Sequence, residues 1–180
     1  MARTKEMDLT TGKPFQVLLK FAIPVILGNL FQLFYTLADS VIVGKTLGAQ
    51  SLAAVGSTSI IIYFVFCFIN GFTGGFGICL GQRCGAKDEE GMRKSVAVST
   101  MLSIVFTIVL TLICCLLAHE ILYLMQIPKD IEQEAYDYMF VVLLGTGATV
   151  FYNMISNMLR ALGDSKTPLD FLVFSSVLNI

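Results

Sequence analysis

The sequence predicts an all-α protein, a polytopic bundle of transmembrane helices. Of its 180 residues, 56% are apolar and only 14% are charged, which is more apolar surface than a soluble domain of this size needs for its core. The apolar residues gather in stretches of about 20, the length at which a helix crosses the roughly 30 Å hydrocarbon core of a bilayer. Most charged residues fall between these stretches. The chain is therefore expected to lie in the lipid bilayer.

Five helices are expected, in the order in which the apolar stretches occur. A tail at 1–14 comes first, and the helices cover approximately 15–43, 52–82, 95–118, 136–160 and 169–180. The last stretch is too short to span a bilayer, and no polar segment follows it. We expect the chain to be an N-terminal piece of a longer protein, truncated in its fifth helix.

The basic residues predict how the helices are oriented. Ten of the twelve Lys and Arg precede the first helix or follow the second and fourth, while Lys45 and Lys129 lie in the other two loops. Because cytoplasmic loops carry an excess of Lys and Arg, the N-terminus is expected in the cytoplasm of a multi-pass plasma membrane protein, in a bacterium the inner membrane. No nucleic acid is expected as a partner.

The first helix carries a carboxylate and a polar stripe. Asn29, Gln32, Thr36 and Asp39 are spaced three, four and three residues apart, so they share one helical face. An ionised side chain within a membrane is costly unless it meets water, a cation or a partner, and it is a functional candidate by default. The stripe is therefore expected to face a cavity inside the protein.

Small and polar residues mark the next two helices. The second ends in a glycine-rich run in which Gly77, Gly81 and Gly85 repeat every four residues, a spacing that lets helices approach closely. The third has a weaker stripe of hydroxyls at 100, 103, 107 and 111.

The fourth helix carries a polar stripe with the same spacing as that of the first. Thr146, Thr149, Asn153 and Ser156 are spaced three, four and three residues apart, and Arg160 follows them. Each hydroxyl or amide alone is an ordinary contact between helices. Three striped helices together predict a shared polar cavity.

Asp39 suggests what the cavity does. A carboxylate in a low dielectric holds a proton near neutral pH, or a small alkali cation when oxygens surround it. Either occupant cancels its charge and changes which packing of the helices is favoured. We expect no metal site, no cofactor and no enzyme activity, but antiport of a proton or sodium ion against an organic compound. The spans have no Lys or Arg away from their ends, which favours neutral or cationic cargo.

Several motifs then resemble those of the multidrug and toxic compound extrusion (MATE) transporters. They are the segments at 22–24, 37–40, 43–44, 47–48, 52–56, 81–86 and 159–168, which read AIP, LADS, VG, LG, LAAVG, GQRCGA and LRALGDSKTP. The resemblance implies two lobes of six helices, of which this chain would supply most of the first. It also implies that Asp39 couples cation movement to drug export, and that Asn179 belongs to a second cation site. The missing C-terminal lobe would be needed for transport.

Three other functions were considered. A flippase or exporter of lipid-linked or other metabolites would share this design, but the lipid-linked cargo calls for several cationic residues in the cavity. An intramembrane aspartyl protease would use Asp137 and Asp164, but these residues fall on opposite sides of the membrane. A receptor or scaffold without transport would leave Asp39 without a task.

Overall fold

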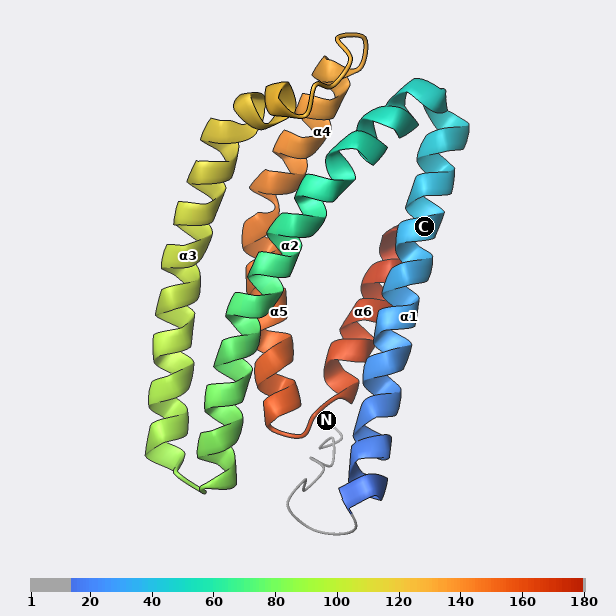
Figure 1. The fold of residues 1–180 in the computed structure, drawn as a ribbon. Helices are drawn as coiled ribbons and strands as arrows, with labels where there is room; N and C mark the ends of the chain where they lie inside the picture. The colour runs from blue at the N-terminus through green and yellow to red at the C-terminus, as the bar shows by residue number, and fades with distance from the viewer. Residues whose placement is uncertain (1–13, 180) are drawn as a thin grey trace.

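The computed structural model describes residues 14–179, and the side chains of 14–176. This part of the chain folds into six α-helices and contains no β-strand (Figure 1). They are α1 (Pro14–Thr46), α2 (Gly48–Gly85), α3 (Glu89–Leu124), α4 (Glu132–Leu144), α5 (Thr146–Ala161) and α6 (Lys166–Asn179). The predicted all-α fold class is confirmed. Of the predicted tail at 1–14, all but Pro14 lies outside the described residues.

Within the described residues, α1, α2 and α3 are each long and apolar enough to cross a membrane, and α4 with α5 makes a fourth span if the pair is counted as one. Large apolar side chains point away from the bundle along these helices, among them Phe64, Met101 and Leu116. Such exposed surface fits contact with lipid chains, which are as apolar as the side chains themselves.

A break at Gly145 divides the fourth predicted helix, which was expected to run without interruption over 136–160. The helix axes of α4 and α5 differ there by 43°. The Ala148 N–H donates to the Gly145 carbonyl only three residues back, at 3.1 Å, while the usual bond from the Thr149 N–H to the same carbonyl lengthens to 3.4 Å. Glycine is the poorest helix former after proline and is a common site of such kinks.

The bundle is tightly packed on one side only. The main core joins α2, α3, α4 and the first turns of α5 around buried side chains such as Ile69, Leu122 and Met139. Figure 1 shows α1 and α6 side by side, away from α3. None of the described side chains of α1 is buried. The α1–α6 pair is thus attached to a compact four-helix core.

Two glycines of the predicted stripe bring α2 against α5. A Cβ added to Gly77 would lie 3.1 Å from the Asn157 carbonyl oxygen, and one added to Gly81 would lie 3.8 Å from the Ala161 Cβ, whereas Gly85 faces open space. The predicted close approach of helices is confirmed at the first two positions. It supports α5, which carries part of the candidate site.

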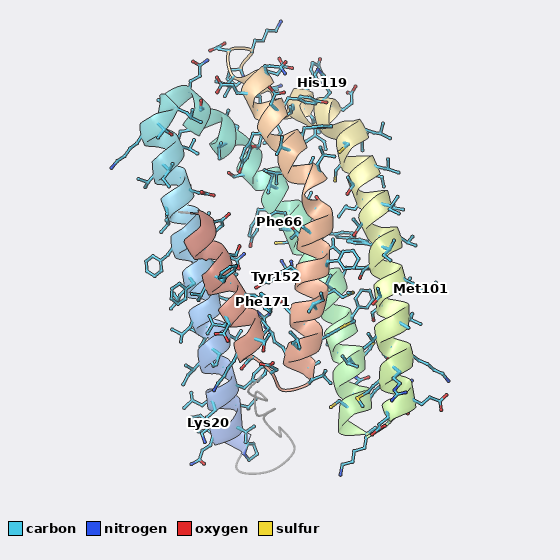
Figure 2. The ribbon with its side chains drawn as sticks, turned by 180° about the vertical axis from the view of Figure 1, so that it is seen from behind. Lys20, Phe66, Met101, His119, Tyr152 and Phe171 are labelled. Atoms are coloured by element: carbon cyan, nitrogen blue, oxygen red, sulfur yellow. The ribbon has the colours of Figure 1, made fainter. Side chains whose placement is uncertain are left out.

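The two ends of the bundle differ in their basic residues: of the nine described Lys and Arg, seven lie at or near one end, while Lys45 and Lys129 lie at the other. We call the basic end the one formed by the start of α1, the α2–α3 turn at 86–88 and the α5–α6 turn at 162–165. The acidic end is formed by the α1–α2 turn and the segment at 125–131. Figure 2 shows Lys20 near the basic end and His119 near the acidic end.

Candidate functional site

A cavity of about 700 Å³ lies between the α1–α6 pair and the core helices α2 and α5. Its aromatic lining includes Phe66, Tyr152 and Phe171, which come from three different helices (Figure 2). Both predicted stripes contribute to its polar lining: Asn29 and Gln32 come from α1, and Thr149, Asn153 and Ser156 come from α5. The other polar lining residues are Tyr35, Asn70, Tyr152, Arg160, Ser165, Ser175 and Ser176. The cavity therefore combines apolar walls with polar groups, as small-molecule sites commonly do.

The other predicted site residues lie outside this lining. Thr36 is exposed and donates to the Gln32 carbonyl of its own helix at 3.0 Å. Thr146 is 1% exposed, and its hydroxyl has no hydrogen-bond partner among the described residues. Asn179 ends α6, and its side chain is outside the described part of the chain.

Asp39 lies on α1 nearer the acidic end and is half-buried. Tyr35, one turn earlier on the same helix, and Tyr138 of α4 both lie within electrostatic range of its carboxylate. Tyr35 also lines the cavity. The carboxylate therefore lies near a residue of the cavity lining, Tyr35, and near α4 of the core.

The stripe of α3 does not contribute to this cavity. Ser103 is fully buried and donates to the Met154 sulfur of α5 at 3.0 Å. Thr107 packs against Gly147, where an added Cβ would lie 3.2 Å from its methyl carbon. The expectation that three striped helices share one cavity is wrong for α3, because its hydroxyls face the tightly packed interface with α5.

Arg160 is a cavity residue that the sequence analysis placed after the stripe of the fourth helix but did not assign to the cavity. It lies in the last turn of α5 and lines the cavity, and its Nε atom is buried without a hydrogen-bond partner among the described residues. It extends the stripe of Thr149, Asn153 and Ser156 by four residues, and that spacing is the signal that could have identified it. It is the one formally charged side chain in the cavity lining.

The α5–α6 turn holds this end of the cavity in place. Gly163 has a φ of +90°, a conformation that favours glycine. Asp164 then accepts hydrogen bonds from the backbone N–H groups of Lys166 and Thr167, both at 3.0 Å, and from the Thr167 hydroxyl. Partial burial raises the pKa of Asp164, but the hydrogen bonds from Thr167 and Lys166 outweigh it and leave the pKa below its ordinary value.

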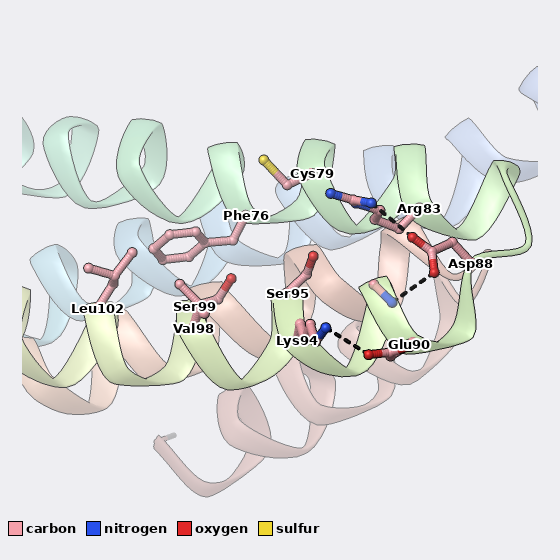
Figure 3. A pocket seen from close by; sticks show the side chains of 11 residues that line it. Phe76, Cys79, Arg83, Asp88, Glu90, Lys94, Ser95, Val98, Ser99 and Leu102 are labelled. Carbon is pink, nitrogen blue, oxygen red and sulfur yellow. Dashed lines mark hydrogen bonds and ion pairs between the residues drawn. The ribbon is translucent and has the colours of Figure 1, made fainter.

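A second hollow, of about 530 Å³, lies at the basic end between α2 and α3 (Figure 3). Its cations are compensated, since Arg83 pairs with Asp88 at 2.8 Å and Lys94 pairs with Glu90 at 2.7 Å. The Gly91 N–H and the Arg83 guanidinium both donate to Asp88 and lower its pKa. This hollow has no unmatched cation to offer a ligand.

The acids considered for a protease do not meet. Asp137 lies on α4 toward the acidic end and accepts a hydrogen bond from Gln133 at 3.0 Å. Asp164 lies in the α5–α6 turn at the opposite end of the same bent span (Figure 1). A shared proton between two catalytic carboxylates requires them to be close, so this pair cannot act as a protease site.

Two bacterial proteins are similar to this chain in sequence. The Bacillus subtilis protein named "Probable multidrug resistance protein YpnP" is 34% identical over 175 residues, which are 97% of this chain and 39% of that protein. "Probable multidrug resistance protein NorM" of Thermotoga maritima is 25% identical over 163 residues, which are 91% of this chain and 35% of that protein. The chain thus spans less than half the length of these relatives.

Solved structures are similar over the same extent. An outward-facing multidrug resistance MATE family transporter of the MOP superfamily superimposes with a TM-score of 0.85 at 28% identity, covering 97% of this chain and 38% of that one. A MOP superfamily transporter from Pyrococcus furiosus Vc1, whose binding pocket is described as having reverse polarity that suggests a different function, superimposes with a TM-score of 0.89 at 28% identity, covering 99% and 39%.

The match to a family model covers most of the chain. Residues 24–180 fit the MatE model, and the relatives at the sequence and structure levels are transporters, not enzymes. The chain therefore belongs to the MatE family of multi-pass membrane transporters.

Proposed function

We propose that this chain forms the first lobe of a cation-coupled antiporter that exports organic compounds by alternating access, and that a second lobe completes the transport pathway. The observation that carries the proposal is the cavity between α1, α2, α5 and α6, to which both predicted stripes contribute polar side chains. Family membership supports the transport function. The proton or sodium ion would be a transported ion and not a cofactor.

Asp39 is the proposed coupling residue. Loss of its negative charge, by a proton or a bound cation, would change the electrostatic field between α1 and α4 and shift the packing preferred by α1. Two features of α1 support such a shift. Its described side chains are not buried, and Pro24 inside it removes one backbone hydrogen bond. The helix that carries the carboxylate is thus not anchored in the core by any buried side chain.

Export of a fluorescent dye tests this role. The complete protein is produced in cells as wild type, as Asp39→Asn and as Asp137→Asn, the last being a control at an exposed carboxylate outside the cavity. We expect Asp39→Asn to lose gradient-driven efflux while still binding the dye, and Asp137→Asn to retain both. Efflux by Asp39→Asn at the wild-type rate would exclude the coupling role.

The coupling ion can be identified in the same system. Everted membrane vesicles are given either a pH gradient or a sodium gradient of equal size, and dye uptake is measured. The gradient that drives uptake in the wild type and not in Asp39→Asn names the ion. A carboxylate among oxygens suits both ions, so the measurement decides between them.

A flippase or exporter of lipid-linked metabolites is the second candidate. Arg160 at the basic end of the cavity is the observation in its favour. A pyrophosphate-linked lipid carries several negative charges, however, and the described lining offers one cation against them. The antiporter therefore remains the preferred function.

A further inference from the structure

We propose that Arg160, together with Ser156 and Ser165, forms an anion-binding subsite at the basic end of the cavity, and that this subsite receives the carboxylate of an aromatic organic cargo. This inference rests on the proposed export function and names a substrate class for it. It also modifies the expectation of neutral or cationic cargo, because a compound bound here would carry a negative group at one end.

Arg160 is half-buried and has no ion-pair partner among the described residues. A guanidinium remains protonated in proteins, and a charge in a low-dielectric site is costly unless it is paired or solvated. The ion pairs of the described residues are Arg83–Asp88 and Lys94–Glu90, and neither involves Arg160. Asp164, the acid four residues later, is instead engaged by the first turn of α6.

Two hydroxyls lie at the same end of the cavity. Ser156 precedes Arg160 by one helical turn and is 4% exposed, and Ser165 in the adjoining turn is 5% exposed. Both line the cavity. Neither hydroxyl forms a hydrogen bond with another group in the described part of the chain. One guanidinium and two hydroxyls can together donate to the two oxygens of a carboxylate, which is the planar group that arginine binds best.

The rest of the cavity suits an aromatic body. Phe66, Tyr152 and Phe171 line it and are labelled in Figure 2, and Phe174 adds a further ring to the lining. Aromatic side chains provide large apolar contact area to a ring-shaped ligand. The described lining contains no acidic side chain that would repel a carboxylate. The arrangement therefore selects an aromatic compound with an anionic end, including a zwitterion.

Two dyes that differ in one group test the subsite. Rhodamine 110 has a free carboxylate, and rhodamine 123 is its methyl ester. Binding of each to the complete purified protein in phosphatidylcholine nanodiscs is measured by fluorescence anisotropy. We expect Arg160→Gln to weaken rhodamine 110 binding at least about tenfold and to leave rhodamine 123 binding nearly unchanged, since only the first dye loses a charge-assisted contact.

Two further variants control for folding and for charge. Arg160→Lys should recover part of the lost affinity for rhodamine 110, because it restores the charge but not the planar fork. Arg83→Gln removes the paired arginine of the second hollow and should change neither affinity. Equal weakening of both dyes in Arg160→Gln would indicate general damage to the cavity, and it would overturn the proposal, as would no change in either dye.

A lipid headgroup is the other source of an anionic group. Adding phosphatidylglycerol to the nanodiscs should leave rhodamine 110 affinity unchanged if the subsite serves cargo, whereas strong competition would assign the site to lipid and overturn the inference. Failure of export is a separate result: a wild type that binds rhodamine 110 through Arg160 but exports neither dye would refute the proposed function and leave the subsite standing.

Discussion

Two turns at the basic end are built from similar residues and reach different outcomes. In the α2–α3 turn, Arg83 is followed five residues later by Asp88, which accepts from the Gly91 N–H at the start of α3 and also pairs with Arg83. In the α5–α6 turn, Arg160 is followed four residues later by Asp164, which binds only the start of α6. Arg160 of the second turn therefore has no ion pair with Asp164, and it lines the cavity.

The difference shows how a capping aspartate determines the environment of a nearby arginine. Asp164 uses its oxygens for two backbone N–H groups and the Thr167 hydroxyl, whereas Asp88 accepts one backbone N–H and has an oxygen left for Arg83. A site for an anion can thus arise where helix capping takes the carboxylate that would otherwise neutralise the cation.

The largest effect on stability is expected at Gly163, the residue of the α5–α6 turn with a positive φ. Gly163→Ala should lower the free energy of unfolding by about 1–2 kcal/mol, because a side chain at its φ of +90° is strained. Lys87 has a φ of +57° in the other turn, so Lys87→Gly should leave stability equal or slightly raised. The measurement is helical circular dichroism during titration with a denaturing detergent. Equal stability of Gly163→Ala and wild type would contradict this picture of the turn.

Removing the cap on α6 should have the next largest effect. Asp164→Ala should cost about 1 kcal/mol, the usual value for a lost N-cap, while Asp164→Asn keeps an acceptor. Because the folded-state pKa of Asp164 is lowered, the stability due to its charge is present above the ordinary aspartate pKa of about 3.9 and is lost as the pH falls through the lower folded value.

The pH dependence gives this prediction a second readout. Unfolding midpoints of wild type and Asp164→Asn are compared from neutral pH down to acidic pH, and the advantage of the wild type should shrink only at the acidic end. An advantage that does not change with pH would show that the carboxylate charge contributes nothing to the cap.

The smallest effect is expected from the exposed ion pair. Arg83→Gln should leave the unfolding midpoint within experimental error, because both side chains of the pair are largely accessible to solvent and such pairs contribute little. Asp88 would keep its bond from the Gly91 N–H. A loss of stability as large as that of Asp164→Ala would mean that the Arg83–Asp88 ion pair stabilises its turn as much as the Asp164 cap stabilises the other.

Much of the fold could be predicted from the sequence. Helices of bilayer length follow from the apolar stretches, and a close helix contact at α2 follows from glycines spaced by four, although the sequence did not identify α5 as the partner. The break at Gly145 was missed, because a single glycine in an apolar helix is tolerated in some contexts and bends the chain in others. The outcome depends on how neighbouring helices pack against it.

The candidate site was predictable only in part. Spacing showed that Asn29 and Gln32 share a face, and likewise Thr149, Asn153 and Ser156, and these two faces do line one cavity. The same reasoning failed for Ser103 and its stripe on α3, because periodicity says which residues share a face and not what that face meets.

The sequence by itself determined the class of molecule, the helices and the polar stripes, because these depend on composition and on periods of a few residues. Only the tertiary structure decided which stripes face one another and which charges have partners. Arg160 illustrates the reason. Its neighbours in the chain include an acid, and whether that acid neutralises it depends on the direction in which the next helix starts.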